Sequence, residues 1–543
     1  MPVLGDSSMQ TQSSDANQLA AEDPWIGMSA QELYDCLSDE LFDFNASDLG
    51  LPLHRTDTGT ERLSLHFLES FTRDNGFVAS FDCGTEEQRL LVKSTYESNP
   101  KHDADTEDYL LVLKSAEIVA LVKEVTVLKP RNSAVSLSWN SDTAKSCLEF
   151  FSTHRLRFYL ELYWALWHPN VNYMHKPSFD IGMSKPGLVA AMAVIGACVS
   201  PDGYDKEQAS MWFNCVEEVV FQDDDFCYDT EDDGGQRVFP SKARLQSIQA
   251  AYMVCLYQNW EGAKASRRRI RRFRYSTLVA VVRDIGIGHA RHPDYSVLPS
   301  TSFAWHEYLV REQLIRTFLW VFLLDTAFVI FNNVPPRMAM KEMKMGFASS
   351  ETNFQAVNKE SCFEGIRHDT MLKTGLISSV VEKMCKAAVS LEEQSSLADL
   401  GPLNLFVLTS ALHSMIFQHQ QTFAPDAHLM PVRNALESWF ATWQLYQQDL
   451  SAPPRHCPLR EEAITPHNMW KRIGFVRYCS EYWLLAKLIT ERISAGTWMS
   501  DGFNQAGNEL HRQGDSVTVL DKYDETSMQQ VNDLISQFQQ VII

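Results

Sequence analysis

Apolar residues recur at helical spacing through most of the chain after residue 145. In the segment 146–169 they occupy nearly every facing position until His168 and Pro169, where the helix is expected to stop. Similar segments, mostly bounded by Gly or Pro, span 185–200, 243–262, 267–288, 303–333, 376–393, 403–421, 432–450 and 469–493. No segment shows the alternation and hairpin turns of β-strands. The pattern predicts an all-α fold, a multi-helix array.

The first 60 residues have a different texture. They are rich in Ser, Asp, Asn and Gln, and are predicted to form a mostly disordered tail. From residue 61 the texture changes, and Leu63, Phe67 and Phe71 at helical spacing predict a short docking helix. The predicted organisation is an acidic-hydrophobic tail at 1–60, a linker with the docking helix at 61–144, a central helical domain at 145–345, and a C-terminal helical extension packed on it at 346–543.

Within the tail, residues 32–53 combine acidic and bulky apolar side chains and contain no Lys or Arg. The acids would keep the apolar groups accessible, and Leu37, Leu41 and Phe44 fall at helical spacing. This composition is typical of activation segments that dock into a coactivator groove. The alternative is an acidic tail that only aids solubility, but such a tail would not need large apolar side chains. We therefore predict an activation segment that acts through Leu37, Leu41, Phe42 and Phe44.

The charge balance limits the interactions of the chain. It holds 48 Lys and Arg against 69 Asp and Glu, a net charge of −21, and residues 1–54 contain ten acids and no base. A chain this acidic does not hold nucleic acid with its overall field. No two of the eleven Cys lie closer than twelve positions, which excludes a Cys-x-x-Cys zinc pair and favours a reducing compartment. The first residues show no basic region followed by an apolar run, so no secretory signal is expected.

Two apolar runs, 187–199 and 318–331, are shorter than the roughly 18–20 residues that span a bilayer. We predict that both are buried core helices and that the protein has no membrane association. The second run carries Asp325 at its middle. Because an unpaired buried carboxylate is costly, Asp325 is expected to bond an Arg or a helix terminus rather than to act in catalysis.

One segment, 264–274, departs from the acidic balance with seven bases and no acid. It is a candidate nuclear-import signal or DNA-facing patch. The alternative, which we favour, is a helix with Ile270 and Phe273 inward and its arginines solvated or paired with the acidic run 217–233, itself predicted to be a solvated loop. The arginines of the patch are Arg267, Arg268, Arg269, Arg271, Arg272 and Arg274.

The sequence contains no phosphate-binding loop, nucleophile elbow or His-Glu-x-x-His pattern. Gly286 and Gly288 fit a helix C-terminal turn, and His289 and His292 lack a third metal ligand nearby in sequence. We therefore predict no catalytic, cofactor-binding or metal-binding residue, and no enzymatic activity.

Four stretches in order, 162–180, 186–200, 245–262 and 305–338, resemble the regulatory middle domain of fungal transcription factors, the fungal-specific transcription factor domain. The segment 67–81 also resembles the stretch immediately C-terminal to a zinc finger in members of this group. The positions that carry the resemblance are Pro169, His175, Lys176, Pro177, Phe179, Gln246, Gln249, Trp305, Glu312, Arg316, Asp325, Pro335 and Pro336.

The resemblance implies an all-helical nuclear regulator, often of a metabolic or secondary-metabolite gene cluster. It implies that the motif residues are structural, with Asp325 and the paired prolines holding a helix end. The middle domain of such proteins restrains or positions activity and contacts partners, and a small-molecule effector is compatible with this role.

The chain departs from the family pattern in its N-terminal part. The family usually reads DNA through a six-cysteine zinc cluster or a pair of Cys-Cys-His-His fingers, but only Cys36 precedes residue 80. We therefore expect no autonomous sequence-specific DNA binding, and DNA contact through a DNA-binding partner protein or a homodimer, with a transcriptional coactivator as a further partner. The rival interpretation is a ligand-sensing or scaffolding all-α protein, or a helical enzyme without a recognised motif.

Overall fold

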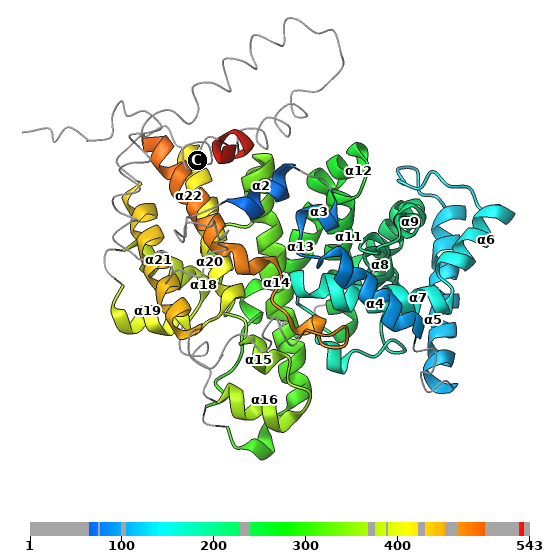
Figure 1. The fold of residues 1–543 in the computed structure, drawn as a ribbon, viewed down its shortest axis with the longest axis horizontal. Helices are drawn as coiled ribbons and strands as arrows, with labels where there is room; N and C mark the ends of the chain where they lie inside the picture. Colours follow the sequence, from blue (N-terminus) through cyan, green and yellow to red (C-terminus); the bar gives the residue numbers. More distant parts are fainter. Residues whose placement is uncertain are drawn as a thin grey trace, which may run out of the picture. The chain divides into compact units, whose positions relative to one another are not determined.

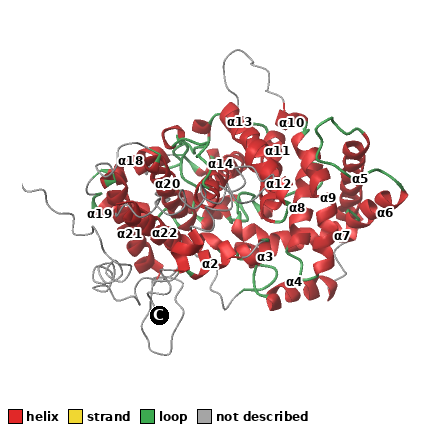
Figure 2. Ribbon diagram, turned by 90° about the horizontal axis from the view of Figure 1, so that it is seen from above, coloured by secondary structure: helices red, strands yellow, loops and turns green. Residues whose placement is uncertain are grey.

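The computed structural model describes residues 65–73, 76–98, 105–227, 239–296, 298–367, 375–386, 389–421, 429–450, 464–494 and 531–536. These residues are helical or irregular, and Figure 2 shows helices joined by loops with no strand in this part of the chain. The predicted all-α fold is confirmed. The candidate activation residues Leu37, Leu41, Phe42 and Phe44 lie outside the described residues.

The helices are labelled in Figure 1. The first group consists of α2 (His66–Arg73), α3 (Phe77–Ser80), α4 (Glu86–Ser98), α5 (Asp105–Val127), α6 (Ser141–Phe150) and α7 (Thr153–Leu162). The π-helical turn η2 (Tyr163–Trp167) and the 3₁₀ turns η3 (His168–Asn170) and η4 (Lys176–Ser178) come next. The second group is α8 (Pro186–Cys198), α9 (Gly203–Phe221), α10 (Asp224–Cys227), α11 (Lys242–Trp260), α12 (Lys264–Arg269), the π-helical turn η5 (Ile270–Arg274) and α13 (Tyr275–Ile285).

The remaining elements begin with the 3₁₀ turns η6 (Ile287–His289) and η7 (Ser300–Ser302) and the long helix α14 (Trp305–Asn332). They continue with η8 (Met340–Glu342), α15 (Glu351–Phe354), α16 (Lys359–Ile366), α18 (Ile377–Cys385), α19 (Leu391–Ala398), α20 (Pro402–Gln420) and α21 (Met430–Leu450). The turns η10 (Met469–Lys471) and η11 (Phe475–Tyr478) precede α22 (Cys479–Ser494).

Helix α14 packs against α11 from the preceding part of the chain and against α20 from the following part. In Figure 1, α14 lies between α11 on one side and α20 on the other. It is long and apolar enough to cross a bilayer, but 94% of its most apolar stretch is buried inside the protein. The other apolar run forms α8, in which nearly every side chain is buried. Both runs are therefore core helices, as predicted.

The docking helix is present as α2, which contains Phe67 and Phe71 and packs on α22, more than 400 positions later in the chain. Leu63, the third residue of the predicted helix, lies outside the described residues. The Phe67 ring stacks on Tyr478 with 4.4 Å between centroids, and the Phe71 ring lies 4.8 Å from that of Phe331 in α14. The structure also contains α4 and α5, two helices that the sequence analysis did not predict.

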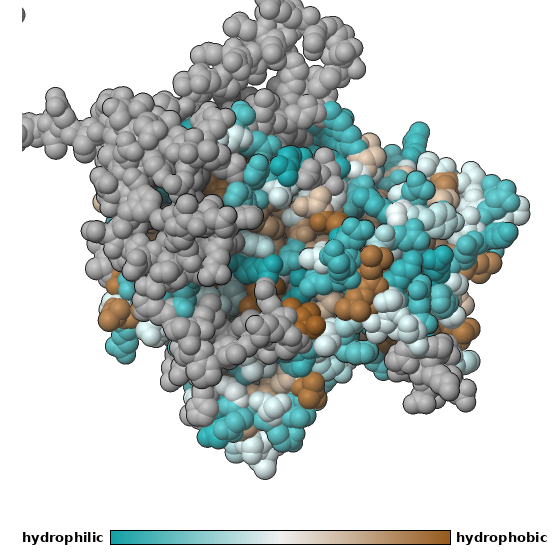
Figure 3. Space-filling model, in the orientation of Figure 1, coloured by the Kyte–Doolittle hydropathy of each residue, from teal (hydrophilic) through white to brown (hydrophobic). Residues whose placement is uncertain are grey.

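Helices from both sides of residue 345 share their packing, because α14 contacts α20 and α2 contacts α22. The proposed boundaries at 60, 144 and 345 stay a prediction. On the face drawn in Figure 3 the described surface is mainly hydrophilic, with apolar side chains in small separate patches.

Helices α7 and α8 approach each other at Gly196, where a Cβ atom would lie only 2.0 Å from the backbone carbonyl oxygen of Tyr159. Because backbone must move to admit a methyl group, we expect Gly196→Ala to lower the free energy of unfolding by about 1–3 kcal/mol. Chemical denaturation followed by circular dichroism measures this change.

The matched control is Gly203→Ala at the start of α9, where nothing lies within 4 Å of the added Cβ. This change is expected to be neutral or to stabilise by about 0.4–1 kcal/mol, because alanine restricts the unfolded chain. Equal effects of the two substitutions would contradict the close approach of α7 and α8.

Candidate functional site

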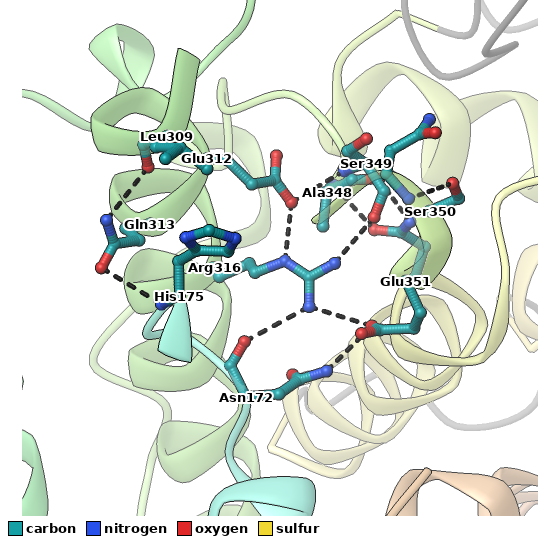
Figure 4. Close-up of polar contacts among 12 residues, drawn as sticks. Asn172, His175, Leu309, Glu312, Gln313, Arg316, Ala348, Ser349, Ser350 and Glu351 are labelled. Carbon is teal, nitrogen blue, oxygen red and sulfur yellow. Dashed lines mark hydrogen bonds and ion pairs between the residues drawn. The ribbon is translucent and has the colours of Figure 1, made fainter. Parts of the chain in front are cut away.

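A charged network lies inside the helical body, centred on Arg316 of α14 (Figure 4). The Arg316 side chain is completely buried, yet its guanidinium donates to Glu312 Oε1 at 2.6 Å and to Glu351 Oε1 at 2.9 Å. It also donates to the carbonyl oxygens of Ser349 at 2.8 Å and Asn172 at 3.3 Å. These four oxygen atoms accept hydrogen bonds from the N–H groups of the planar guanidinium.

Glu312 is the second centre of the network. Its Oε1 accepts from the Ser349 backbone N–H at 2.9 Å, and its Oε2 lies 2.7 Å from His292 Nε2. Burial raises the pKa of Glu312, but Arg316 and His292 outweigh burial and hold this pKa below its usual value. Burial likewise opposes charge on Arg316, and Glu351 and Glu312 raise the Arg316 pKa. The network is therefore an ionised, hydrogen-bonded cluster in the core.

The network joins segments that are far apart in sequence. Glu312 and Arg316 lie one helical turn apart on α14, Glu351 begins α15, and Asn172 comes after the aromatic turns η2 and η3. The Arg316 guanidinium also lies over the Phe354 ring, 4.0 Å from its centroid. Since neither Arg316 nor Glu312 is exposed, this arrangement holds segments together and does not present a group to a substrate.

Asp325 lies further along α14 and is also buried. Its Oδ2 accepts from the backbone N–H groups of Arg337 and Met338, each at 2.8 Å. The expected partner was an Arg side chain or a helix terminus, and the observed partners are backbone amides of the chain after α14. Burial raises the pKa of Asp325 to about 6, although these amides and the Arg337 charge lower it.

The segment that Asp325 holds is the turn after α14. The helix ends at Asn333, a left-handed residue with φ of 49°, a conformation that Asn tolerates. Pro335 is exposed and Pro336 half-buried, and Pro cannot continue a helix. The helix end is thus set by Asn333, by the two prolines and by the Asp325 carboxylate.

The predicted motif turn before α8 packs against distant segments. The Pro169 carbonyl oxygen accepts from the Gly474 N–H at 3.2 Å. The His175 ring contacts Ser178 Oγ at 2.8 Å and the carbonyl oxygen of Ala356 at 3.1 Å. Burial lowers the pKa of His175 to about 4, so the ring is neutral near pH 7.

The other two positions of this turn are less enclosed. Pro177 is exposed, and half-buried Phe179 lies edge-on to Trp164 with 5.3 Å between ring centroids. Pro169, His175 and Phe179 therefore make packing or hydrogen-bonding contacts in the structure, whereas Pro177 is exposed. That the motif residues have a structural role stays a prediction.

Residues 160–447, more than half of the chain, match the family described as the fungal specific transcription factor domain. The chain belongs to this family. The protein is 44% identical over 519 residues to Transcription factor verF of Penicillium polonicum, a match that covers 88% of this chain and 70% of the relative. It is 23% identical over 310 residues to Zinc finger protein zas1 of Schizosaccharomyces pombe, covering 55% of this chain and 32% of that relative. No solved structure matches.

Membership of the fungal-specific transcription factor family makes the protein a transcriptional regulator, as the sequence analysis predicted. The family match extends to residue 447, about one hundred residues beyond the resemblance noted from the motifs, and so includes Glu351 and α20. The domain therefore contains every charged member of the Arg316 network.

The basic segment of this family domain is partly neutralised by the body. Arg269 donates to Glu217 at 2.7 Å, and Arg274 donates to Glu217 at 2.9 Å and to Glu218 at 3.0 Å. Both glutamates are buried in α9. The prediction that the acidic run is a solvated loop is therefore wrong for Glu217 and Glu218, because they are core partners of arginine. The run also contains 228–233, which lies outside the described residues.

The orientation of Phe273 also differs from the prediction. Ile270 is buried as expected, but Phe273 is 65% exposed, and Arg274 turns inward in its place. The segment Ile270–Arg274 is a π-helical turn, with hydrogen bonds from i to i+5. Positions three apart in such a turn no longer share one face, which explains the error. The remaining arginines of the patch, Arg267, Arg268, Arg271 and Arg272, each have an interaction partner within the protein.

Metal ligands do not gather in the part of the chain that the structure places: no group of three or more His, Cys, Asp or Glu residues could hold an ion there. His292, singled out from its spacing to His289, instead bonds the Glu312 carboxylate. The sequence analysis missed Glu351 as a partner of Arg316, because the polar stretch that contains it carried no periodic signal.

The α2 helix is held by Glu481 of α22, whose carboxylate accepts from the backbone N–H groups of Phe67 at 3.2 Å and Leu68 at 3.0 Å. Burial raises the pKa of Glu481 to about 7, although these two amides lower it. An acid whose pKa is raised on folding adds stability below its unfolded pKa, and this contribution is lost as the pH rises through the folded value.

We therefore expect tighter docking of α2 at pH 6 than at pH 8. Hydrogen exchange of the amides in residues 65–73, corrected for intrinsic rates, measures this difference. Glu481→Gln, which keeps an acceptor oxygen but cannot titrate, should remove the pH dependence. An unchanged pH dependence in this variant would assign the effect to other groups.

Proposed function

We propose that this protein is a nuclear transcriptional activator of a metabolic or secondary-metabolite gene cluster that reaches DNA through a partner protein or a homodimer. The proposal combines the regulatory family domain with the acid and apolar pattern of residues 32–53. The pattern carries the activator role, because it suits a segment that folds its apolar face onto a coactivator. The network around Arg316, which is inaccessible to substrate, favours a regulatory over a catalytic role.

Activation is tested with residues 1–60 fused to a foreign DNA-binding domain and a reporter gene. We expect strong reporter expression, and loss of most of it when Leu37, Leu41, Phe42 and Phe44 are replaced by Ala. The matched control replaces Val3, Leu4, Leu19 and Met28, four apolar residues of the same tail, and should retain expression. A silent fusion would refute the activator role and leave the family assignment intact.

Dependence on a partner is supported by charge. The net charge is −21, and Arg269 and Arg274 of the basic segment are bound to buried glutamates. Binding through the remaining arginines would be independent of sequence, with dissociation constants of roughly 10⁻⁴–10⁻⁶ M at physiological salt. We therefore expect this chain alone to form no sequence-selective complex below about 10⁻⁷ M.

A gel-shift with purified full-length chain and competitor DNA checks this expectation. Nanomolar binding that prefers one sequence would contradict the need for a partner. Chromatin immunoprecipitation gives the second measurement, because occupancy at promoters should appear in cells and disappear when the partner is deleted.

The target class is tested by deleting the gene and measuring transcripts. Reduced expression of a group of adjacent metabolic genes is the expected result. Reduced expression of unlinked genes alone would contradict control of a cluster.

A further inference from the structure

A pocket of about 550 Å³ opens beside the segment that follows α13, residues 288–293, near the middle of the family domain. Its lining includes His289, Arg291 and His292 from this segment. The rest of the wall includes Arg311 of α14 and Phe239, which precedes α11. Volumes of about 300–1,000 Å³ are usual for sites that bind small molecules. The pocket thus has the size of a ligand site and a lining dominated by basic and aromatic side chains.

The two arginines differ from Arg269, Arg274 and Arg316, which are each paired with buried carboxylates. The side chains of Arg291 and Arg311 form no ion pair or hydrogen bond with any residue that the structure describes, although acids outnumber bases by 69 to 48 in the chain. The Arg311 guanidinium lies over the Phe239 ring, 4.7 Å from its centroid, which fixes it at the pocket wall.

The guanidinium groups and the aromatic wall define the chemistry of an occupant. Guanidinium presents donors in a planar fork that matches a carboxylate or a phosphate group. The Phe239 side chain offers a flat apolar surface beside that charge. We propose that the pocket binds a small organic anion, with its carboxylate or phosphate on Arg291 and Arg311 and its apolar part against Phe239.

The pocket is connected to the buried network by direct contacts. His292, in the pocket lining, lies 2.7 Å from Glu312 Oε2, and Glu312 accepts from the backbone of Ser349. The neighbouring Ala290 carbonyl oxygen accepts from the Gly346 N–H at 2.9 Å. An anion bound to residues 289–292 therefore affects the position of residues 346–349. Through these residues it affects the contacts between α14 and α15. This effector role rests on the proposed function, whereas the binding site itself does not.

Binding is tested by isothermal titration of the full chain with phenyl phosphate and with benzoate, using benzyl alcohol as the neutral counterpart. We expect one saturable site for the anions and none for the alcohol at concentrations up to about 10 mM. A preference for phenyl phosphate would identify a phosphate ligand, and a preference for benzoate a carboxylate ligand. Absence of saturable binding for both anions would overturn the proposal, as would equal binding of the alcohol.

The double variant Arg291→Gln with Arg311→Gln should weaken anion binding by at least about tenfold, because two charge-assisted hydrogen bonding groups are lost. The charge-matched control, Lys129→Gln with Arg131→Gln, changes exposed residues after α5 and should bind as the parent chain does. Equal losses in both double variants would show a general effect of net charge and refute the site. If circular dichroism shows the pocket variant to be unfolded, the exposed Arg291→Gln alone replaces it, with a loss of about threefold or more expected.

Three further outcomes separate this proposal from others. Displacement of phenyl phosphate by a short DNA duplex of any sequence would make the pocket a contact for the nucleic-acid backbone and overturn the small-anion proposal. In a second reporter, which carries the full chain fused to a foreign DNA-binding domain, a pocket variant that binds no anion but keeps full, unregulated expression would support the effector role, and a pocket variant regulated like the parent chain would refute it. A silent tail fusion combined with intact anion binding would refute the activator function alone.

Discussion

Replacing Arg316 by Met should lower the free energy of unfolding by about 3–5 kcal/mol, the largest effect we expect of a single substitution. The reason is that Glu312 and Glu351 would remain buried without the guanidinium that both contact. Loss of one partner of a buried ion pair leaves an uncompensated charge, which costs more than the pair contributes. Chemical denaturation followed by circular dichroism and by tryptophan fluorescence measures the change.

Two comparisons make this result specific. Arg131→Met removes an exposed arginine and should change stability by no more than about 0.5 kcal/mol. Arg316→Met combined with Glu312→Gln and Glu351→Gln should recover part of the loss, because the unpaired charges disappear with their partner. A single variant as stable as the parent would show that the charges are not enclosed.

Replacing Asp325 by Ala should lower the free energy of unfolding by about 2–5 kcal/mol, since each buried donor left unsatisfied costs about 1–3 kcal/mol. The carboxylate is the acceptor for the backbone N–H groups of Arg337 and Met338, and Met338 is fully buried. The turn after α14 would lose its attachment, and so we expect protease cleavage near residues 333–338 to accelerate as well.

Asp325→Asn provides the control, because its amide oxygen can still accept while its charge is gone. Burial raises the Asp325 pKa to about 6, so the contribution of this group to stability is present below its unfolded pKa and is lost as the pH rises through about 6. The parent chain should therefore lose stability between about pH 4 and pH 6 relative to Asp325→Asn. A parallel pH dependence of the two proteins would contradict the burial of the carboxylate.

The helical class and the core helices could be predicted from the sequence because the signal is local. Periodic apolar positions and the stop at Pro169 describe each helix by itself, and α8 and α14 have the burial that their composition predicts. The docking helix was found for the same reason, since Phe67 and Phe71 lie one turn apart on α2.

The contacts of the charged residues could not be predicted, because each joins distant segments. Glu351 lies 35 positions from Arg316, and Asp325 bonds backbone amides, which no side-chain pattern reveals. The sequence analysis predicted that the arginines of the basic segment are solvated or paired with the acidic run, but it did not identify Glu217 as a buried partner of Arg274, 57 positions away. The inward direction of Arg274 follows from the π-helical turn that places Phe273 in solvent. The π-helical turn thus exposes Phe273 and buries most of Arg274, the reverse of what a regular α-helix would do.

The contact between α2 and Glu481 has a consequence for the synthesis of the chain. Leu68 leaves the ribosome 413 positions ahead of its partner, a delay of roughly 20–80 s at about 5–20 residues per second. During that time the aromatic rings of α2 have no α22 to cover them, and exposed apolar surface on a nascent chain promotes aggregation. Production of the protein should therefore depend on chaperones that shield the N-terminal helices until α22 has emerged.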